Sequence, residues 1–195
     1  MASVVFPSFL LIATCFSLYV STPALAASPP DIASMLPESK VPQESINDMC
    51  SKTKDPDFCN KFAEGDMQTF LTIGDKGKTK VLNTAIDILS VSDQQFSSTL
   101  KNEKISEEDK NVVQTCLALY EKVKVSLKES ATTADSGKLG RHLQAAGESL
   151  WQCEVALQAA KDSKVAQEIR VSNSLTNYFV SYMQNEFYAH IVTKY

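Results

Sequence analysis

The sequence predicts an all-α protein: an up-down-up-down four-helix bundle preceded by a disulfide-stapled N-terminal helical hairpin. Three observations support this prediction. No proline follows Pro56, as long helices require. Apolar residues after that point recur at steps of three and four, which is the period of one helix face. Two cysteines, Cys50 and Cys59, flank a sharp break in the chain, so a bridge between them would close a small hairpin.

Residues 1–26 have the features of a cleaved secretory signal peptide. Residues 4–20 are mostly apolar, and Ala24-Leu25-Ala26 places small residues where a signal peptidase cleaves. A proline and several polar residues interrupt the apolar stretch, so it is marginal as a membrane span. No later segment is apolar enough to cross a bilayer. We therefore expect a secreted protein without a membrane partner after cleavage.

The hairpin is expected over residues 44–64, after a flexible lead-in over residues 27–43 that contains four prolines. Pro56 excludes Asp55 from helical geometry and suits the first residue of a new helix. Thr53 is expected near the end of the first helix. Residues 64–77 contain three glycines and are expected to form mainly a loop.

The bundle is expected over residues 79–192, with helices at about 79–101, 106–130, 139–160 and 165–191. Ser106 and the three acidic residues after it are typical of an N-cap followed by a charged first turn. The third helix has the cleanest apolar seam, with steps of four and three. Trp151 lies beside the seam residue Leu150, so we expect a half-buried side chain that packs on the flank of the bundle.

Four cysteines remain after the signal peptide, an even number that favours disulfides in a secreted chain. Three connectivities are possible. The short separation of Cys50 and Cys59 favours a local bridge, which leaves Cys116 to pair with Cys153. The last two cysteines fall on the apolar seams of the second and third bundle helices, which an antiparallel pair would bring together.

The sequence offers no set of residues that would make an enzyme. It lacks a phosphate-binding glycine loop, a G-x-S-x-G elbow and the paired Glu-x-x-His motifs of di-iron bundles. Cysteine pairs and clustered histidines of the kind that hold zinc are also missing. The net charge is −4 and no basic block occurs, which argues against nucleic acid. We therefore expect no catalytic residue, cofactor or metal.

Three motifs resemble those of the plant invertase and pectin methylesterase inhibitor family. They are the opening C-x-x-T-x-x-P-x-x-C, a C-L-x-x-Y on the second bundle helix and an L-S-A-A stretch before the fourth cysteine. The matching residues are Cys50, Thr53, Pro56 and Cys59 in the first motif, Cys116 and Tyr120 in the second, and Leu143, Ala145, Ala146 and Cys153 in the third. The resemblance covers nearly the whole chain after the signal peptide.

The resemblance implies a secreted, non-catalytic inhibitor with the bridges Cys50–Cys59 and Cys116–Cys153. Such proteins inhibit carbohydrate enzymes of the cell wall or vacuole by covering the active-site cleft with a face of the bundle. Some invertase inhibitors carry a Pro-Lys-Phe or related tripeptide between the second and third bundle helices. No proline occurs there in this chain, which favours pectin methylesterase over invertase as the target. We therefore expect reversible 1:1 inhibition of pectin methylesterase in the apoplast, with the vacuole as the alternative location.

Two alternatives stay open. One is inhibition of a cell-wall or vacuolar invertase. The other is a secreted binding or structural module that keeps the scaffold without inhibitory activity. The second alternative rests on a departure from the family pattern, because Gln152 stands before Cys153 where the family often has threonine. The motifs do not identify the inhibitory contact residues.

Overall fold

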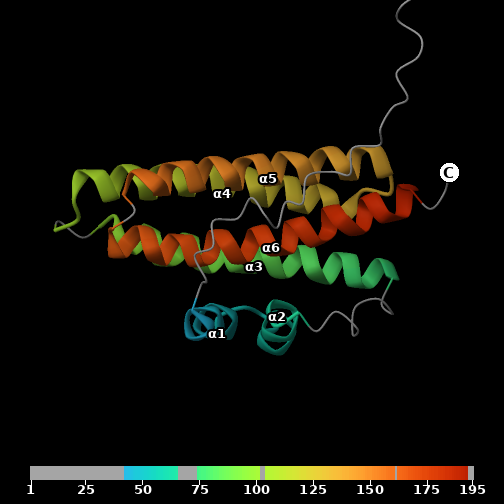
Figure 1. The fold of residues 1–195 in the computed structure, drawn as a ribbon, viewed down its shortest axis with the longest axis horizontal. Coiled ribbons are helices and arrows are strands. Elements are labelled where there is room, and N and C mark those ends of the chain that lie inside the picture. Colours follow the sequence, from blue (N-terminus) through green and yellow to red (C-terminus); the bar gives the residue numbers. More distant parts are fainter. Residues whose placement is uncertain (1–41, 66–73, 102–103, 161, 193–195) are drawn as a thin grey trace, which may run out of the picture. The chain divides into compact units, whose positions relative to one another are not determined.

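The computed structural model describes residues 42–65, 74–101, 104–160 and 162–192, which form six α-helices and no strand (Figure 1). The predicted all-α fold is therefore confirmed for this part of the chain. The expected signal peptide and residues 27–41 of the expected lead-in lie outside the described residues. None of the described helices combines the length and the apolar character that crossing a bilayer needs.

The hairpin consists of α1 (Gln43–Ser51) and α2 (Pro56–Ala63). Helix α1 begins one residue before the expected hairpin because the Pro42 carbonyl accepts hydrogen bonds from the N–H groups of Ser45 and Ile46. Asp55 is non-helical (φ −132°, ψ 78°), and its Oδ1 accepts a hydrogen bond from the Phe58 N–H at 3.1 Å. Pro56 thus follows a side-chain N-cap, the position that suits a residue without an N–H.

Helix α3 (Gly74–Thr99) begins five residues earlier than the sequence pattern predicted. Glycine lowers helix propensity by about 1 kcal/mol relative to alanine, which is why this segment was expected to be a loop. Tertiary contacts outweigh that preference. Gly77 is buried, and Lys78 Nζ donates to the carbonyl of Thr133, 3.4 Å away at the end of another helix.

Helices α4 (Glu107–Thr132), α5 (Ser136–Ala159) and α6 (Lys164–Val192) complete the bundle. Ser106 Oγ accepts a hydrogen bond from the Asp109 N–H at 3.0 Å, as its sequence context predicted. Asp135 caps α5 in the same way, at 2.8 Å from the Lys138 N–H. Helix α5 therefore begins three residues before the expected Leu139, because the residues interpreted as a turn contain its N-cap.

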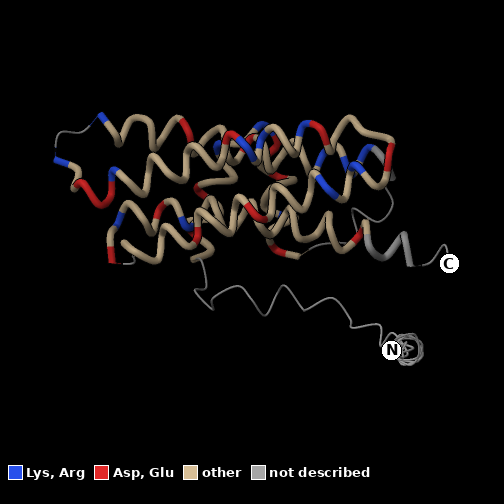
Figure 2. The backbone as a smooth tube through the Cα atoms, turned by 90° about the horizontal axis from the view of Figure 1, so that it is seen from above, with Lys and Arg blue, Asp and Glu red and all other residues tan. Residues whose placement is uncertain are grey.

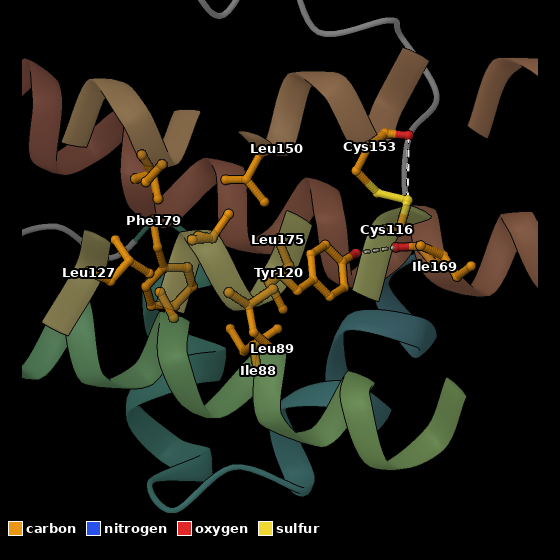
Figure 3. Packing of buried hydrophobic residues seen from close by; sticks show 14 of the residues in the cluster. Ile88, Leu89, Cys116, Tyr120, Leu127, Leu150, Cys153, Ile169, Leu175 and Phe179 are labelled. Carbon is orange, nitrogen blue, oxygen red and sulfur yellow. Dashed lines mark hydrogen bonds between the residues drawn. A yellow bond between two sulfur atoms is a disulfide. The ribbon is translucent and has the colours of Figure 1, made fainter. Parts of the chain in front are cut away.

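The four long helices alternate in direction along the chain (Figure 1). Each packs against its neighbour in sequence, and α6 packs back against α3 to close the bundle. The core between them is apolar and fully buried (Figure 3). Among its largest members are Leu89, Tyr120, Leu127, Leu150, Ile169 and Phe179. The predicted up-down-up-down topology is confirmed.

Aromatic side chains attach the hairpin to the bundle. The Phe62 ring is fully buried, and its centroid lies 4.3 Å from that of Phe179 on α6. Tyr178 and Tyr182 meet the same ring edge-on, with centroids 5.6 and 5.0 Å away. Tyr178, Phe179 and Tyr182 of α6 therefore pack directly against the hairpin.

Candidate functional site

The described residues hold no cluster of side chains that could bind a metal ion. Nowhere in this part of the chain do three His, Cys, Asp or Glu side chains gather as a metal would require. His142 Nδ1 lies 2.9 Å from Glu129 Oε2 in an isolated pair that joins α5 to α4. The side chain of His190 lies outside the described residues.

The first motif builds the bend of the hairpin, and most of its matching residues are buried. The Sγ atoms of Cys50 and Cys59 are 2.05 Å apart in a disulfide, and both residues have no exposed surface. Thr53 Oγ1 donates to the Cys50 carbonyl at 2.7 Å, which closes the end of α1. Pro56 starts α2. Three of these side chains, those of Cys50, Thr53 and Cys59, are inaccessible to a partner.

The second and third motifs lie largely in the bundle core. Cys116 on α4 and Cys153 on α5 form a buried disulfide (Figure 3). Tyr120 Oη lies 3.1 Å from Ser172 Oγ and 3.3 Å from the Ile169 carbonyl of α6. Leu143 and Ala146 are buried, whereas Ala145 is exposed. The motif residues therefore specify the scaffold rather than a contact surface.

The outer face of α5 carries the most exposed aromatic side chain of the described residues. The α5 outer face comprises Gln144, Glu148, Trp151, Gln152 and Val155, all exposed. Trp151 is 68% exposed and Val155, one turn later, is 45% exposed. The expectation that Trp151 is half-buried is therefore wrong. Leu150 points into the core, and the next residue of a helix is rotated by about 100°, which turns the indole outward.

Polar contacts hold α5 firmly against α6 beneath this face. Arg170 Nε donates to Glu154 Oε1 at 3.2 Å, and the two side chains are only 17% and 15% exposed. Arg170 Nη2 also donates to the Leu157 carbonyl at 3.2 Å. Asn173 Nδ2 donates to the Leu150 carbonyl at the same distance. The Cys116–Cys153 disulfide joins α5 to α4 on its other side. Helix α5 is therefore fixed by both neighbours, and Trp151 projects from it.

The α5 outer face is almost uncharged. Between Gln144 and Ala159, helix α5 has two charged residues, Glu148 and Glu154, and Glu154 is paired with Arg170. Elsewhere on the described helices, basic and acidic residues are interspersed (Figure 2). An exposed tryptophan in a surface depleted of charge is characteristic of the core of a protein–protein interface. The signal in the sequence is the 3.6-residue period, which places Trp151 about 100° from Leu150 on a flank of the helix. That period does not show whether a neighbouring helix covers the flank.

The family model described as plant invertase/pectin methylesterase inhibitor matches residues 44–188. A crystal structure of a pectin methylesterase inhibitor from Arabidopsis thaliana is similar, with 17% sequence identity and a TM-score of 0.48. That match covers 73% of this chain and 95% of the other. No curated protein matches the sequence significantly.

Proposed function

Because the chain belongs to the plant invertase/pectin methylesterase inhibitor family, we propose that it is a secreted, non-catalytic protein inhibitor of pectin methylesterase. The inhibitor binds reversibly and 1:1, with the α5 outer face over the active-site cleft of the enzyme. The observation that supports this surface is the exposure of Trp151 on a helix that is fixed from both sides. Binding needs no covalent step.

The energetics of a tryptophan anchor fit this role. A tryptophan buries 150–250 Å² in an interface, and apolar burial contributes roughly 25 cal/mol per Å². Because Trp151 is 68% exposed, about two thirds of that area is still available, and its burial in a complex offers roughly 3–4 kcal/mol. Part of this gain offsets the entropic cost of association. Val155 extends the apolar surface, and the glutamines beside it supply hydrogen bonds at the rim.

The proposal includes the route to the cell wall. It assigns residues 1–26 to a signal peptide, residues 27–43 to a lead-in, residues 44–64 to the hairpin and residues 79–192 to the bundle. The apoplast is the proposed location. Mass spectrometry of the protein secreted by expressing plant cells should find a chain that begins near Ala27, and retention of residues 1–26 would contradict secretion by cleavage.

The inhibition assay uses this secreted protein with purified pectin methylesterase and purified acid invertase at acidic pH. We expect esterase activity to fall to a 1:1 endpoint and to return on dilution, with invertase unaffected. Inhibition of invertase alone would establish the alternative target. If neither enzyme loses activity at micromolar protein, the non-inhibitory binding module is the correct description.

Trp151→Ala tests the proposed surface. A buried interface tryptophan typically contributes 2 kcal/mol or more, so we expect esterase inhibition to weaken by about 30-fold. Val125→Ala is the matched control, because Val125 is also apolar and 54% exposed but lies on α4. Its Kd should stay within about threefold of wild type. Undiminished inhibition by Trp151→Ala would place the binding surface elsewhere while leaving the inhibitor function intact.

A further inference from the structure

Glu148 and Trp151 lie three residues apart on the α5 outer face, so their side chains are surface neighbours on one helix. Glu148 is the one exposed charge of this helix between Gln144 and Ala159. Gln144 Nε2 donates to Glu148 Oε1 at 2.9 Å. No described residue donates to Glu148 Oε2. A carboxylate held in place by a neighbouring amide therefore stands beside a flat apolar ring.

This pair shares two features with a uronic acid, a flat apolar surface and a carboxylate beside it. Pectin is a polymer of galacturonic acid, and removal of its methyl esters leaves free carboxylates along the chain. Each unit presents a ring with an apolar face and a carboxyl group. We propose that Trp151 and Glu148 together take the place of one galacturonate unit in the cleft of the target enzyme. This inference rests on the proposed function and deepens it by naming the substrate chemistry that the inhibitor imitates.

Burial of Glu148 in the complex would make the inhibitor select between target enzymes. A carboxylate removed from water without a partner costs several kcal/mol. The described structure supplies no cation beside Glu148, so a cleft that covers the α5 outer face must supply the donors itself. We expect a cleft that accommodates free uronate carboxylates to have such donors, because a carboxylate removed from water needs hydrogen-bond partners. A cleft built for sucrose, a neutral sugar, has no need of them, so Glu148 favours pectin methylesterase over invertase.

The test measures the Kd of the full secreted inhibitor for pectin methylesterase at several salt concentrations. Glu148→Gln keeps the shape of the side chain and removes its charge. We expect a loss of affinity of about tenfold and a flatter dependence on salt, because one desolvated charge contact is lost. Glu148→Asp should recover part of the affinity. Glu107→Gln is the control, since that carboxylate is 83% exposed and lies in the first turn of α4. It should shift Kd by less than about twofold.

The ring is tested in the same assay. Trp151→Phe keeps a flat aromatic surface and should retain affinity within about fivefold, whereas Trp151→Ala should not. Uronate mimicry is overturned if Glu148→Gln inhibits as well as wild type, or if it loses no more than Glu107→Gln. In either case a wild-type protein that still inhibits the esterase leaves the proposed function standing. A wild-type protein that inhibits no esterase overturns both.

Discussion

Tyr120 links two helices of the bundle through a single buried hydroxyl. Its ring lies in the core between α4 and α6, and its Oη donates to the Ile169 carbonyl (Figure 3). The same Oη also lies within hydrogen-bond distance of Ser172 Oγ. Burial raises the pKa of the Tyr120 phenol far above its ordinary value. The hydrogen bonds hold α6 in register with α4, which explains why a tyrosine, and not a phenylalanine, suits this position of the motif.

Tyr120→Phe should lower the free energy of unfolding by about 1 kcal/mol, the net value of one hydrogen bond. Ser172 keeps its own hydrogen bond to Ile169, so no buried donor is left unpaired. For a chain of this size the Tm should fall by about 2–4 °C in a calorimetric scan. Tyr178→Phe is the control, because it keeps the ring contact with Phe62, and it should change the Tm less.

Tyr120→Phe should also change how the stability of the protein depends on alkaline pH. The raised pKa means that Tyr120 stays protonated in the folded protein while the unfolded chain ionises near pH 10. Its contribution to stability is therefore complete below about pH 10 and is lost as the pH rises further. The stability difference between wild type and Tyr120→Phe should shrink above pH 10. A constant difference up to pH 11 would show that the phenol is not buried as described.

At the level of elements, the disulfide between α4 and α5 determines how the proposed binding face is presented. Cys116 and Cys153 are 37 residues apart in sequence and are fully packed in the core. In the chain-entropy model a loop of this length stabilises the fold by about 4 kcal/mol. The bridge also limits movement of α5 relative to α4, so its loss should affect binding as well as stability.

The double substitution Cys116→Ala and Cys153→Ala tests this role. We expect a loss of about 2–5 kcal/mol, which corresponds to a Tm lower by several degrees in a thermal melt. Cys50→Ala with Cys59→Ala opens a loop of only nine residues and should cost less, about 2–3 kcal/mol. Esterase inhibition should weaken more in the first pair than in the second. An unchanged Tm in the first pair would reject the Cys116–Cys153 bridge.

At the level of the whole molecule, charges join the hairpin to the bundle. Lys80 Nζ on α3 lies 2.8 Å from Asp55 Oδ2, and Lys54 Nζ lies 2.8 Å from Asp87 Oδ1. Lys80 Nζ also lies 4.3 Å from the centroid of the Phe58 ring. The hydrogen bond from Lys80 holds the pKa of Asp55 below its ordinary value of 3.8. Attachment of the hairpin is therefore sensitive to acid.

The sign of this effect follows from the lowered pKa. Asp55 contributes stability that is present above about pH 4 and is lost as the pH falls through its folded pKa. Asp55→Asn keeps an N-cap for α2 and removes the charge. Its stability should approach that of wild type as the pH falls from 6 to 3 in denaturant titrations. Lys80→Met should flatten the pH dependence in the same way, and a gap that stays constant to pH 3 would contradict the role of this pair.

Asp93 works in the opposite direction. Burial raises the pKa of Asp93, although its carboxylate pairs with Lys124. Because the pKa of Asp93 is higher in the folded protein than in the unfolded chain, its contribution to the free energy of unfolding is complete below the pKa of the unfolded chain. That contribution is lost as the pH rises through the pKa of the folded protein. The two carboxylates therefore offset each other in acid. Comparing the stability of wild type with that of Asp55→Asn isolates the contribution of Asp55 to the pH dependence, because Asp93 is present in both proteins.

Much of the fold could be predicted from local patterns. The breaks at Pro56 and Ser106, the seam of α5 and the family motifs act through neighbouring residues, so they can be recognised without a structure. The starts of α3 and α5 were predicted too late, since contacts with the end of α4 and the cap by Asp135 decide them. The domain boundaries at residues 26 and 43 stay a prediction.

The proposed binding face could not be predicted in the same way. The sequence specifies which residues are apolar and how they recur, and this is enough for the helices, the hairpin and the family. Whether Trp151 is covered depends on which helix packs beside α5 and at what rotation. Side chains from α4 and α6 decide that, because a helix has several flanks and only its neighbours determine which one meets water. The exposed indole, and the lone carboxylate beside it, are therefore properties of the assembled bundle.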